Sequence, residues 1–97
     1  MIVRLVRLTL APDRLEAFDA MFWQHQADIQ AQPGCHGVEL LGDPEDARVR
    51  LTLSRWSSEE ALNQYRASAL FGQIWPVTKA MFAAPPRAWT YPIHASE

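Results

Sequence analysis

The sequence predicts an α+β fold whose segments follow one another as strand, helix, strand, strand, helix, strand. Three observations lead to this prediction. Four segments rich in β-branched, aromatic or leucine residues occur at 2–10, 37–42, 48–56 and 87–93. Between them lie two segments with apolar residues at helical spacing, and stretches with Pro and Gly separate the segments. The 97 residues suffice for one domain and are too few for two.

The first predicted strand, residues 2–10, is apolar on both faces, which indicates that both faces are covered. Pro12 then suits the first turn of a helix. That helix carries one stripe with 3-4-3-4 spacing, and the stripe includes a histidine: Leu15, Phe18, Phe22, His25 and Ile29. The stretch Gln32-Pro33-Gly34 is expected to end the helix.

The next two predicted strands, residues 37–42 and 48–56, flank a turn of sequence GDPEDA. The second of them alternates between two kinds of side chain, as a strand with two different faces does. Val49, Leu51 and Leu53 lie on one face, and Arg50, Thr52 and Ser54 on the other.

The second helix is predicted to begin with a capping box, in which Ser57 is the cap and Glu60 reaches back. Its inward residues are Ala61, Leu62 and Tyr65. The following stretch, SALFGQIWPVTK at residues 68–79, is expected to be a loop or a broken helix, because Pro76 interrupts helical geometry. Trp75 is then expected at the joint, and Pro76 would start a short helix that carries Val77, Met81 and Phe82.

Pro85-Pro86 separates this stretch from the last predicted strand, residues 87–93, and the tail at 94–97 is expected to be frayed. The complete order is the split βαβ, ferredoxin-like arrangement. It predicts a single domain over residues 1–97, with a four-stranded antiparallel sheet and both helices on one face of it.

The other face of the sheet is predicted to hold a mainly apolar set of side chains: Val3, Leu5, Arg7, Glu39, Leu41, Arg50 and Thr52. This set is too apolar to face water, so we expect a second copy of the chain to cover it and form a homodimer. Arg7, Arg50 and Glu39 are expected to neutralise one another across the dimer, since buried charges need partners.

Charge and cysteine content argue against several functional classes. A formal net charge of −2 and scattered arginines give no electrostatic basis for binding nucleic acid or an anionic membrane. Cys35 is the only cysteine, so we expect no intrachain disulfide and no thiolate metal cluster, and interpret it as a small apolar residue. The N-terminal MIVRLVRLTL does not resemble a signal peptide, and no apolar run approaches the ~18 residues of a membrane helix. We therefore expect a soluble, cytoplasmic protein.

Three segments, PGCHGVELL, SRWSSEEALNQYRAS and FGQIWPVTKAMF, follow a strand and a long helix in an order that resembles the antibiotic biosynthesis monooxygenase superfamily. The resemblance spans nearly the whole chain, and W-S-S-E-E-A-L-x-x-Y-x-x-S is its most recognisable part. It implies a dimeric α/β barrel of ferredoxin-like subunits. It also implies that molecular oxygen oxidises a small aromatic substrate (an anthrone, another polyketide phenol or a quinol) without a cofactor.

One branch of this superfamily instead binds and degrades haem. Its members supply a histidine ligand from the helix shortly after the position that resembles Phe71, whereas this chain has Trp75 there. Several relatives also use an asparagine from the first strand, but the only asparagine here is Asn63, on the second helix. These departures disfavour haem. His36 and His94 make no metal-binding spacing with His25, so no metal is expected either.

His25 is the candidate catalytic residue, because it lies on the inward stripe of the first helix. It is either a packing histidine at the edge of the core or a general base in a pocket between helix and sheet. A neutral imidazole can accept a phenolic proton near neutral pH, and oxygen takes an electron more readily from the phenolate than from the phenol. A cofactor-free oxygenase also needs a dry aromatic cavity and hydrogen-bond donors for the developing anion.

Phe22, Tyr65, Phe71 and Trp75 are the candidate substrate-binding residues. Each also has a structural interpretation: core packing for Phe22, Phe71 and Trp75, and a rim hydroxyl for Tyr65. The leading hypothesis is a cofactor-independent monooxygenase that acts on an aromatic quinol or polyketide-type phenol. The alternative is a non-catalytic dimeric domain of the same fold that binds a small molecule or serves a stress response.

Overall fold

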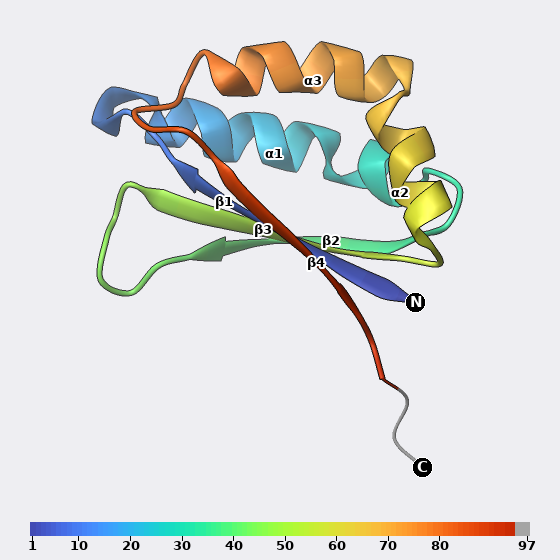
Figure 1. The fold of residues 1–97 in the computed structure, drawn as a ribbon. Helices are drawn as coiled ribbons and strands as arrows, with labels where there is room; N and C mark the ends of the chain where they lie inside the picture. Colours follow the sequence, from blue (N-terminus) through green and yellow to red (C-terminus); the bar gives the residue numbers. More distant parts are fainter. Residues whose placement is uncertain (95–97) are drawn as a thin grey trace.

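The computed structural model describes residues 1–94, and its order of elements confirms the predicted α+β fold (Figure 1). The elements are β1 (Ile2–Thr9), a short 3₁₀ helix η1 (Pro12–Arg14), α1 (Leu15–Gln30), β2 (Cys35–Gly42), β3 (Val49–Trp56), α2 (Glu59–Arg66), α3 (Ala69–Lys79) and β4 (Arg87–Pro92). The second half therefore contains two helices, α2 and α3. The predicted frayed tail lies outside the described residues from residue 95 on. No helix in the described part of the chain is long and apolar enough to cross a membrane.

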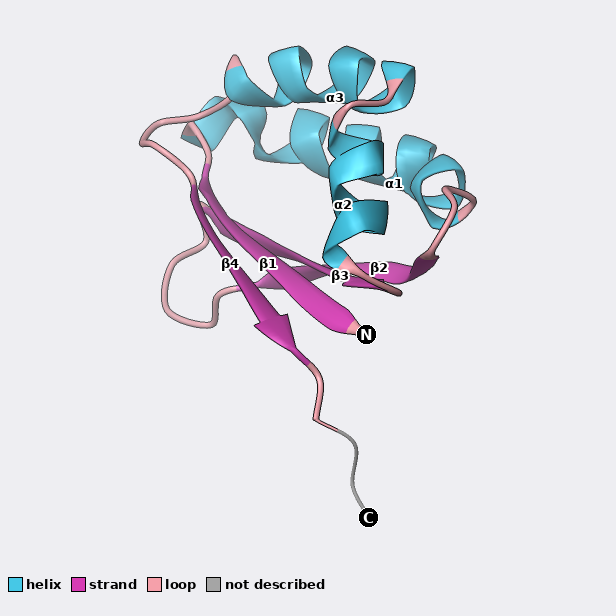
Figure 2. Cartoon of the chain, turned by 45° about the vertical axis from the view of Figure 1, so that its right-hand side comes forward, coloured by secondary structure: helices cyan, strands magenta, loops and turns pink. Residues whose placement is uncertain are grey.

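All four strands form one antiparallel sheet in the order β2-β3-β1-β4. The helices lie together on one face of this sheet, as Figure 2 shows. With β1 and β3 in the centre, this is the ferredoxin-like arrangement that the element order predicts. The register places Leu5 of β1 opposite both Leu53 of β3 and Trp89 of β4.

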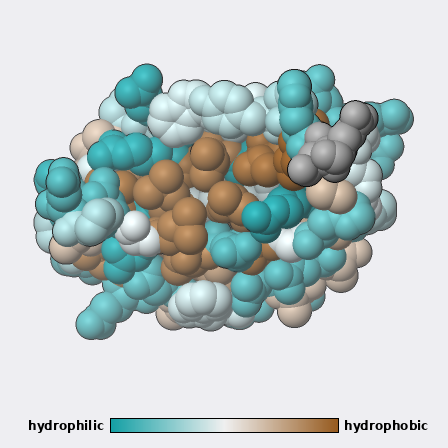
Figure 3. Space-filling view, turned by 90° about the horizontal axis from the view of Figure 1, so that it is seen from below, coloured by the Kyte–Doolittle hydropathy of each residue, from teal (hydrophilic) through white to brown (hydrophobic). Residues whose placement is uncertain are grey.

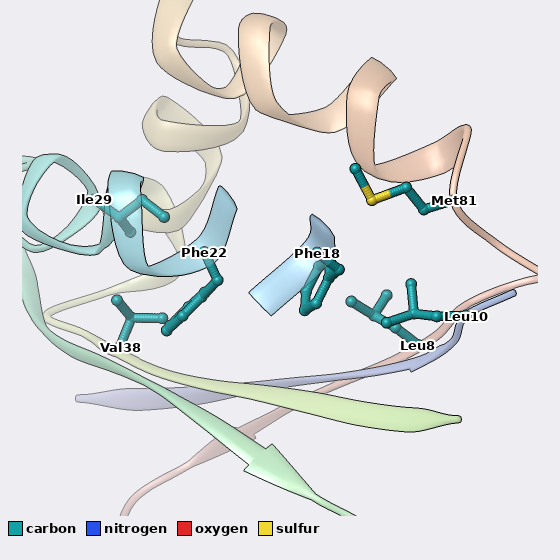
Figure 4. Packing of buried hydrophobic residues seen from close by; sticks show 7 residues of the cluster. All are labelled: Leu8, Leu10, Phe18, Phe22, Ile29, Val38 and Met81. Atoms are coloured by element: carbon teal, nitrogen blue, oxygen red, sulfur yellow. The ribbon is translucent and has the colours of Figure 1, made fainter. Parts of the chain in front are cut away.

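The hydrophobic core lies between α1 and the covered face of the sheet (Figure 4). Its buried members are Leu8, Leu10, Phe18, Phe22, Ile29, Val38 and Met81. Phe18 and Phe22 point from α1 toward the strands in Figure 4, as the 3-4-3-4 spacing predicts. Because His25 belongs to the same stripe, α1 directs it toward this layer too.

The structure corrects the predicted start of the second helix by one residue. Ser58, not Ser57, is the N-cap of α2, and its Oγ accepts a hydrogen bond from the backbone N–H of Ala61 at 3.1 Å. Ser57 belongs to the preceding turn. Its own N–H donates to the Gly34 carbonyl at 2.8 Å, and its hydroxyl lies 2.7 Å from Nε2 of His36. Ser57 is thus held in the turn by its hydrogen bonds, and Ser58 caps the helix.

The predicted break at Pro76 is also wrong. Helix α3 runs from Ala69 to Lys79 and contains Pro76 in its interior, so Trp75 lies within a helix rather than at a joint. A proline here removes the hydrogen bond to the carbonyl of Gly72. Gly72 and Pro76 are both exposed, so water can solvate the Gly72 carbonyl. The helix continues past the proline to Lys79, and the Ala80 N–H donates to the Pro76 carbonyl at 3.3 Å.

A third correction concerns the two faces of β3. Val6 lies opposite Thr52 and Leu8 opposite Arg50, and partners in an antiparallel pair share a face. Since Leu8 is in the core, Arg50 and Thr52 lie under the helices. They are therefore not on the open face, which is the face of the sheet that no helix of residues 1–94 covers (Figure 2). The helices can cover the charge of Arg50 because Asp19 of α1 pairs with it through two hydrogen bonds of 3.0 and 3.1 Å.

Leucines of β3 therefore lie on the open face, whose apolar members are Val3, Leu5, Leu41, Leu51, Leu53 and Trp89. Figure 3, seen from this side, shows a central hydrophobic patch surrounded by hydrophilic side chains. Arg50 lies on the covered face, so it takes no part in the neutralisation predicted with Arg7 and Glu39 across the dimer. Within the chain, Arg7 lies 4.0 Å from Asp43, and Arg55 pairs with Glu39 at 3.1 Å.

Candidate functional site

A cavity of about 260 Å³ lies between the helices and the covered face of the sheet. Its walls come from all three α-helices and all four strands. The structure brings all five residues selected from the sequence to this cavity: Phe22, His25, Tyr65, Phe71 and Trp75. Two other lining residues, Arg66 of α2 and Ala88 of β4, are exposed, which indicates that the cavity reaches the surface at their side.

A continuous run of aromatic rings forms one wall of the cavity. Tyr65 stacks on Trp56 with ring centroids 5.1 Å apart, and Phe71 meets Tyr65 edge to face at 5.3 Å. Phe71 and Trp75 are four residues apart in α3, so they share one side of the helix and stack at 5.6 Å. Trp56 is fully buried and donates from Nε1 to Ser54 Oγ at 2.9 Å, which fixes the base of the wall. Such a wall suits a planar aromatic ligand.

His25 contributes the cavity's unpaired nitrogen. Its Nδ1 is buried without a hydrogen-bond partner, and within residues 1–94 no other buried side-chain nitrogen or oxygen is in this situation. A buried polar atom without a partner costs free energy, so such atoms are uncommon and call for a functional explanation. A rotation of the imidazole that brings Nδ1 to the cavity would let a ligand hydroxyl supply the missing partner, by donating to Nδ1 in the tautomer whose proton is on Nε2.

Tyr65 complements His25 as a hydrogen-bond donor. Burial raises the pKa of Tyr65 to about 12, and the nearby Cys35, when ionised, raises it in the same direction. The phenol therefore keeps its proton throughout the physiological pH range. Among the residues selected from the sequence, His25 on α1 thus offers an acceptor and Tyr65 on α2 a durable donor.

Sequence analysis missed five polar residues that line the same cavity: Arg4, Thr52, Ser54, Arg66 and Thr78. Arg4 shares a face of β1 with Val6, and its Nη1 donates to Thr90 Oγ1 at 2.9 Å. Burial lowers the pKa of Arg4 and the positive charge of Arg66 lowers it further, although a guanidinium remains charged. A signal for Arg4 was present in the alternation of β1, where it occupies the same face as the core residue Leu8.

Cys35 lies half-buried beside the site, at the start of β2. Its Sγ is 3.8 Å from the Gly37 carbonyl, and burial raises the pKa of its thiol. The thiol therefore stays protonated near neutral pH and packs as a small apolar group. In residues 1–94, no three His, Cys, Asp or Glu side chains form a group that could hold a metal ion.

Comparison with known proteins identifies relatives of the chain. The family model described as antibiotic biosynthesis monooxygenase matches residues 1–75, a range that contains all five residues selected from the sequence. None of the curated proteins matches.

Solved structures share the fold over nearly the whole length. One from Bordetella bronchiseptica, named as a candidate antibiotic biosynthesis monooxygenase, is 23% identical and matches over 97% of each chain with a TM-score of 0.87. One of the same description from Caulobacter crescentus is 21% identical over 99% of this chain and 90% of that chain, also at 0.87. A protein of Mycobacterium tuberculosis is 18% identical over 99% and 98% of the two chains, again at 0.87. At these identities the likeness shows the fold alone.

Proposed function

The chain belongs to the antibiotic biosynthesis monooxygenase family, and we propose that it oxidises an aromatic quinol or polyketide-type phenol with molecular oxygen and without a cofactor. One observation carries this proposal: the buried, unpaired Nδ1 of His25 in a cavity with an aromatic wall. Phe22, Tyr65, Phe71 and Trp75 are the proposed substrate-binding residues, and His25 is the proposed base.

The proposed reaction begins with transfer of the phenolic proton to His25. The resulting phenolate is electron-rich enough to give one electron directly to oxygen, so the proposed reaction needs no metal or flavin. Recombination of the two radicals at a ring carbon gives a peroxide anion, which takes the proton back from His25 and becomes a hydroperoxide. When that ring carbon still carries its hydrogen, loss of water from it leaves a carbonyl, so one oxygen atom enters the product and the other leaves as water.

The surrounding residues support each of these steps. Tyr65 keeps its proton and can donate to the developing oxyanion or peroxide. The stacked rings of Phe71 and Trp75 offer a flat surface to the substrate and keep water from the reacting atoms. The volume of about 260 Å³ lies near the lower end of the ~300–1,000 Å³ typical of small-molecule sites, which favours a compact ring system.

We further propose that the working form is a homodimer in which two sheets meet through their open faces. The hydrophobic patch of Figure 3 supports this assembly, since a leucine-rich sheet face exposed to water is costly. The patch is more apolar than the sequence predicts, because Leu51 and Leu53 occupy it where Arg50 and Thr52 were expected. A cytoplasmic location stays a prediction from the sequence.

A non-catalytic binding domain is the second candidate. The chain has a single candidate base in its cavity and no asparagine in β1, and a retained fold does not guarantee retained chemistry. Such a domain would bind the same aromatic molecules in the same cavity and leave them unchanged.

Oxygen consumption separates the two candidates. Metal-stripped protein would be tested against quinols, dihydroxynaphthalenes and anthrones, each beside its autoxidation blank, with labelled oxygen to follow the atom into the product. Uptake above the blank together with one labelled oxygen atom in the product is the result expected of a monooxygenase. Saturable binding of these compounds with no uptake above the blank would favour the binding domain.

A further inference from the structure

Two guanidinium groups line the cavity together with the aromatic wall. Arg4 comes from β1 at the covered face of the sheet, and Arg66 from the last turn of α2. They lie close enough for the charge of Arg66 to act on Arg4. The hydrogen bond that the structure gives to Arg4 is the one from Nη1 to the neutral Thr90 hydroxyl at 2.9 Å.

Neither of these guanidinium groups has a carboxylate partner within the described residues. The ion pairs of residues 1–94 involve Arg7, Arg48, Arg50 and Arg55. The contrast with Arg50 is informative, because Arg50 also lies under the helices and Asp19 neutralises it there at 3.0 Å. Within residues 1–94, Arg50 under the helices thus has a counter-ion, whereas Arg4, which lines the cavity, has none.

The partly buried Arg4 and the exposed Arg66 repel each other, and an anion between them would relieve this repulsion. Withdrawing a charge from water costs free energy, and a second positive charge nearby adds repulsion. The pKa of Arg4 responds to both effects, with burial as the larger cause. A carboxylate is the natural complement, because a guanidinium binds it through two parallel N–H···O bonds.

We propose that Arg4 and Arg66 form a subsite for a carboxylate on the aromatic substrate, so that the protein accepts aromatic hydroxy acids in preference to neutral phenols. This inference names the substrate class of the proposed function and rests on it for the reacting end of the molecule. The carboxylate binds where Arg66 brings the cavity to the surface, and the ring lies against Phe71 and Trp75. The subsite then fixes which end of the ring system faces His25.

Equilibrium binding without oxygen tests this subsite independently of catalysis. The probes are a hydroxynaphthoate and its neutral carboxamide, followed by quenching of tryptophan fluorescence under anaerobic conditions. We expect the acid to bind about tenfold more tightly than the amide, as a charge-assisted hydrogen-bond pair allows, and less so at high salt. Equal affinities for the two probes, or no saturable binding of the acid, would overturn the proposal.

Variants assign the preference to the two arginines. Arg4→Gln and Arg66→Gln should each reduce the preference for the acid, while Arg4→Lys should keep part of it because a charge remains. Arg66 is exposed, so its variant keeps the test valid even if Arg4→Gln fails to fold.

Arg87→Gln is the control, since Arg87 lies over the Trp89 ring at 5.2 Å and does not line the cavity. An unchanged preference in both glutamine variants would contradict the assignment. Binding of the acid without oxygen uptake would keep the subsite and remove the proposed chemistry.

Discussion

Tyr65 and His25 face one cavity with opposite hydrogen-bonding roles, and their surroundings set those roles. Tyr65 is held between Trp56 and Phe71, so its phenol is withdrawn from water and keeps its proton. Nδ1 of His25 is buried without a partner and can accept. The sequence predicted both residues from helical spacing. It did not predict Arg4, because residues 2–10 are apolar on both faces, so the alternation that puts Arg4 beside Leu8 did not show which face the helices cover.

The raised pKa of Tyr65 predicts a loss of stability at high pH. The folded protein keeps the Tyr65 proton up to about pH 12, whereas the unfolded chain releases it near the ordinary tyrosine value of about 10. The contribution is complete below about pH 10 and is lost as the pH rises through about 12, on the order of 2 kcal/mol in total. Urea denaturation at intervals across this window should show a steeper decline for the wild type than for Tyr65→Phe.

Tyr91→Phe provides the matched control, because it leaves Tyr65 as the only tyrosine. The phenolate absorbance of this variant should appear around pH 12. A phenolate that forms near pH 10 in the folded variant, or parallel stability curves for wild type and Tyr65→Phe, would show that Tyr65 is not withdrawn from water.

Single elements show where sequence rules stop being decisive. The proline rule predicted a break in residues 68–79, but α3 tolerates Pro76 because the carbonyl that loses its partner, that of Gly72, faces solvent. The alternation of β3 was predicted correctly, but its two sets of side chains were assigned to the wrong faces of the sheet. The pattern does not reveal that Asp19 of α1 accompanies Arg50 under the helices. Both errors concern an interaction with a distant element or with water that local patterns do not contain.

Pro76→Ala is expected to stabilise the protein. The substitution restores a backbone donor to Gly72 and removes the ring from the helix interior, so the free energy of unfolding should rise by about 1–3 kcal/mol. Urea denaturation measures the change, and Gln73→Ala at an exposed position of α3 is the control, expected within about 0.5 kcal/mol of the wild type. A Pro76→Ala variant less stable than the wild type would mean that the proline holds a conformation the helix alone does not adopt.

For the whole molecule, the layered fold was the most predictable feature, because element order alone determines the ferredoxin-like sheet and leaves one face without helices. The apolar character of that face was also predicted, although β3 supplies it with leucines rather than with Arg50 and Thr52. The position of the cavity between helices and sheet was predicted from the inward-facing residues of the helices. The strand residues Arg4, Thr52 and Ser54 in its lining were not predicted, because their place depends on which face of the sheet the helices cover.

The proposed homodimer predicts a particular response to a charge at the centre of the open face. Leu53 of β3 lies opposite Leu5 in the middle of the sheet, so Leu53→Asp would bury a carboxylate between the two copies. Light scattering at micromolar concentration should give twice the chain mass for the wild type and the chain mass for this variant. Val77→Asp, at an exposed position of α3, should remain dimeric. A monomeric wild type would refute the assembly.

The central claim is that His25 accepts the phenolic proton, and oxygen uptake by His25→Ala beside the wild type tests it most directly. His36→Ala is the control, because His36 is exposed at the start of β2 beside Ser57 and does not line the cavity. On a substrate that the wild type oxidises, we expect kcat to fall about 10²–10⁴-fold in His25→Ala, as for loss of a general base, and to change little in His36→Ala. Uptake by His25→Ala at the wild-type rate would contradict the claim, and the base would then have to be sought elsewhere.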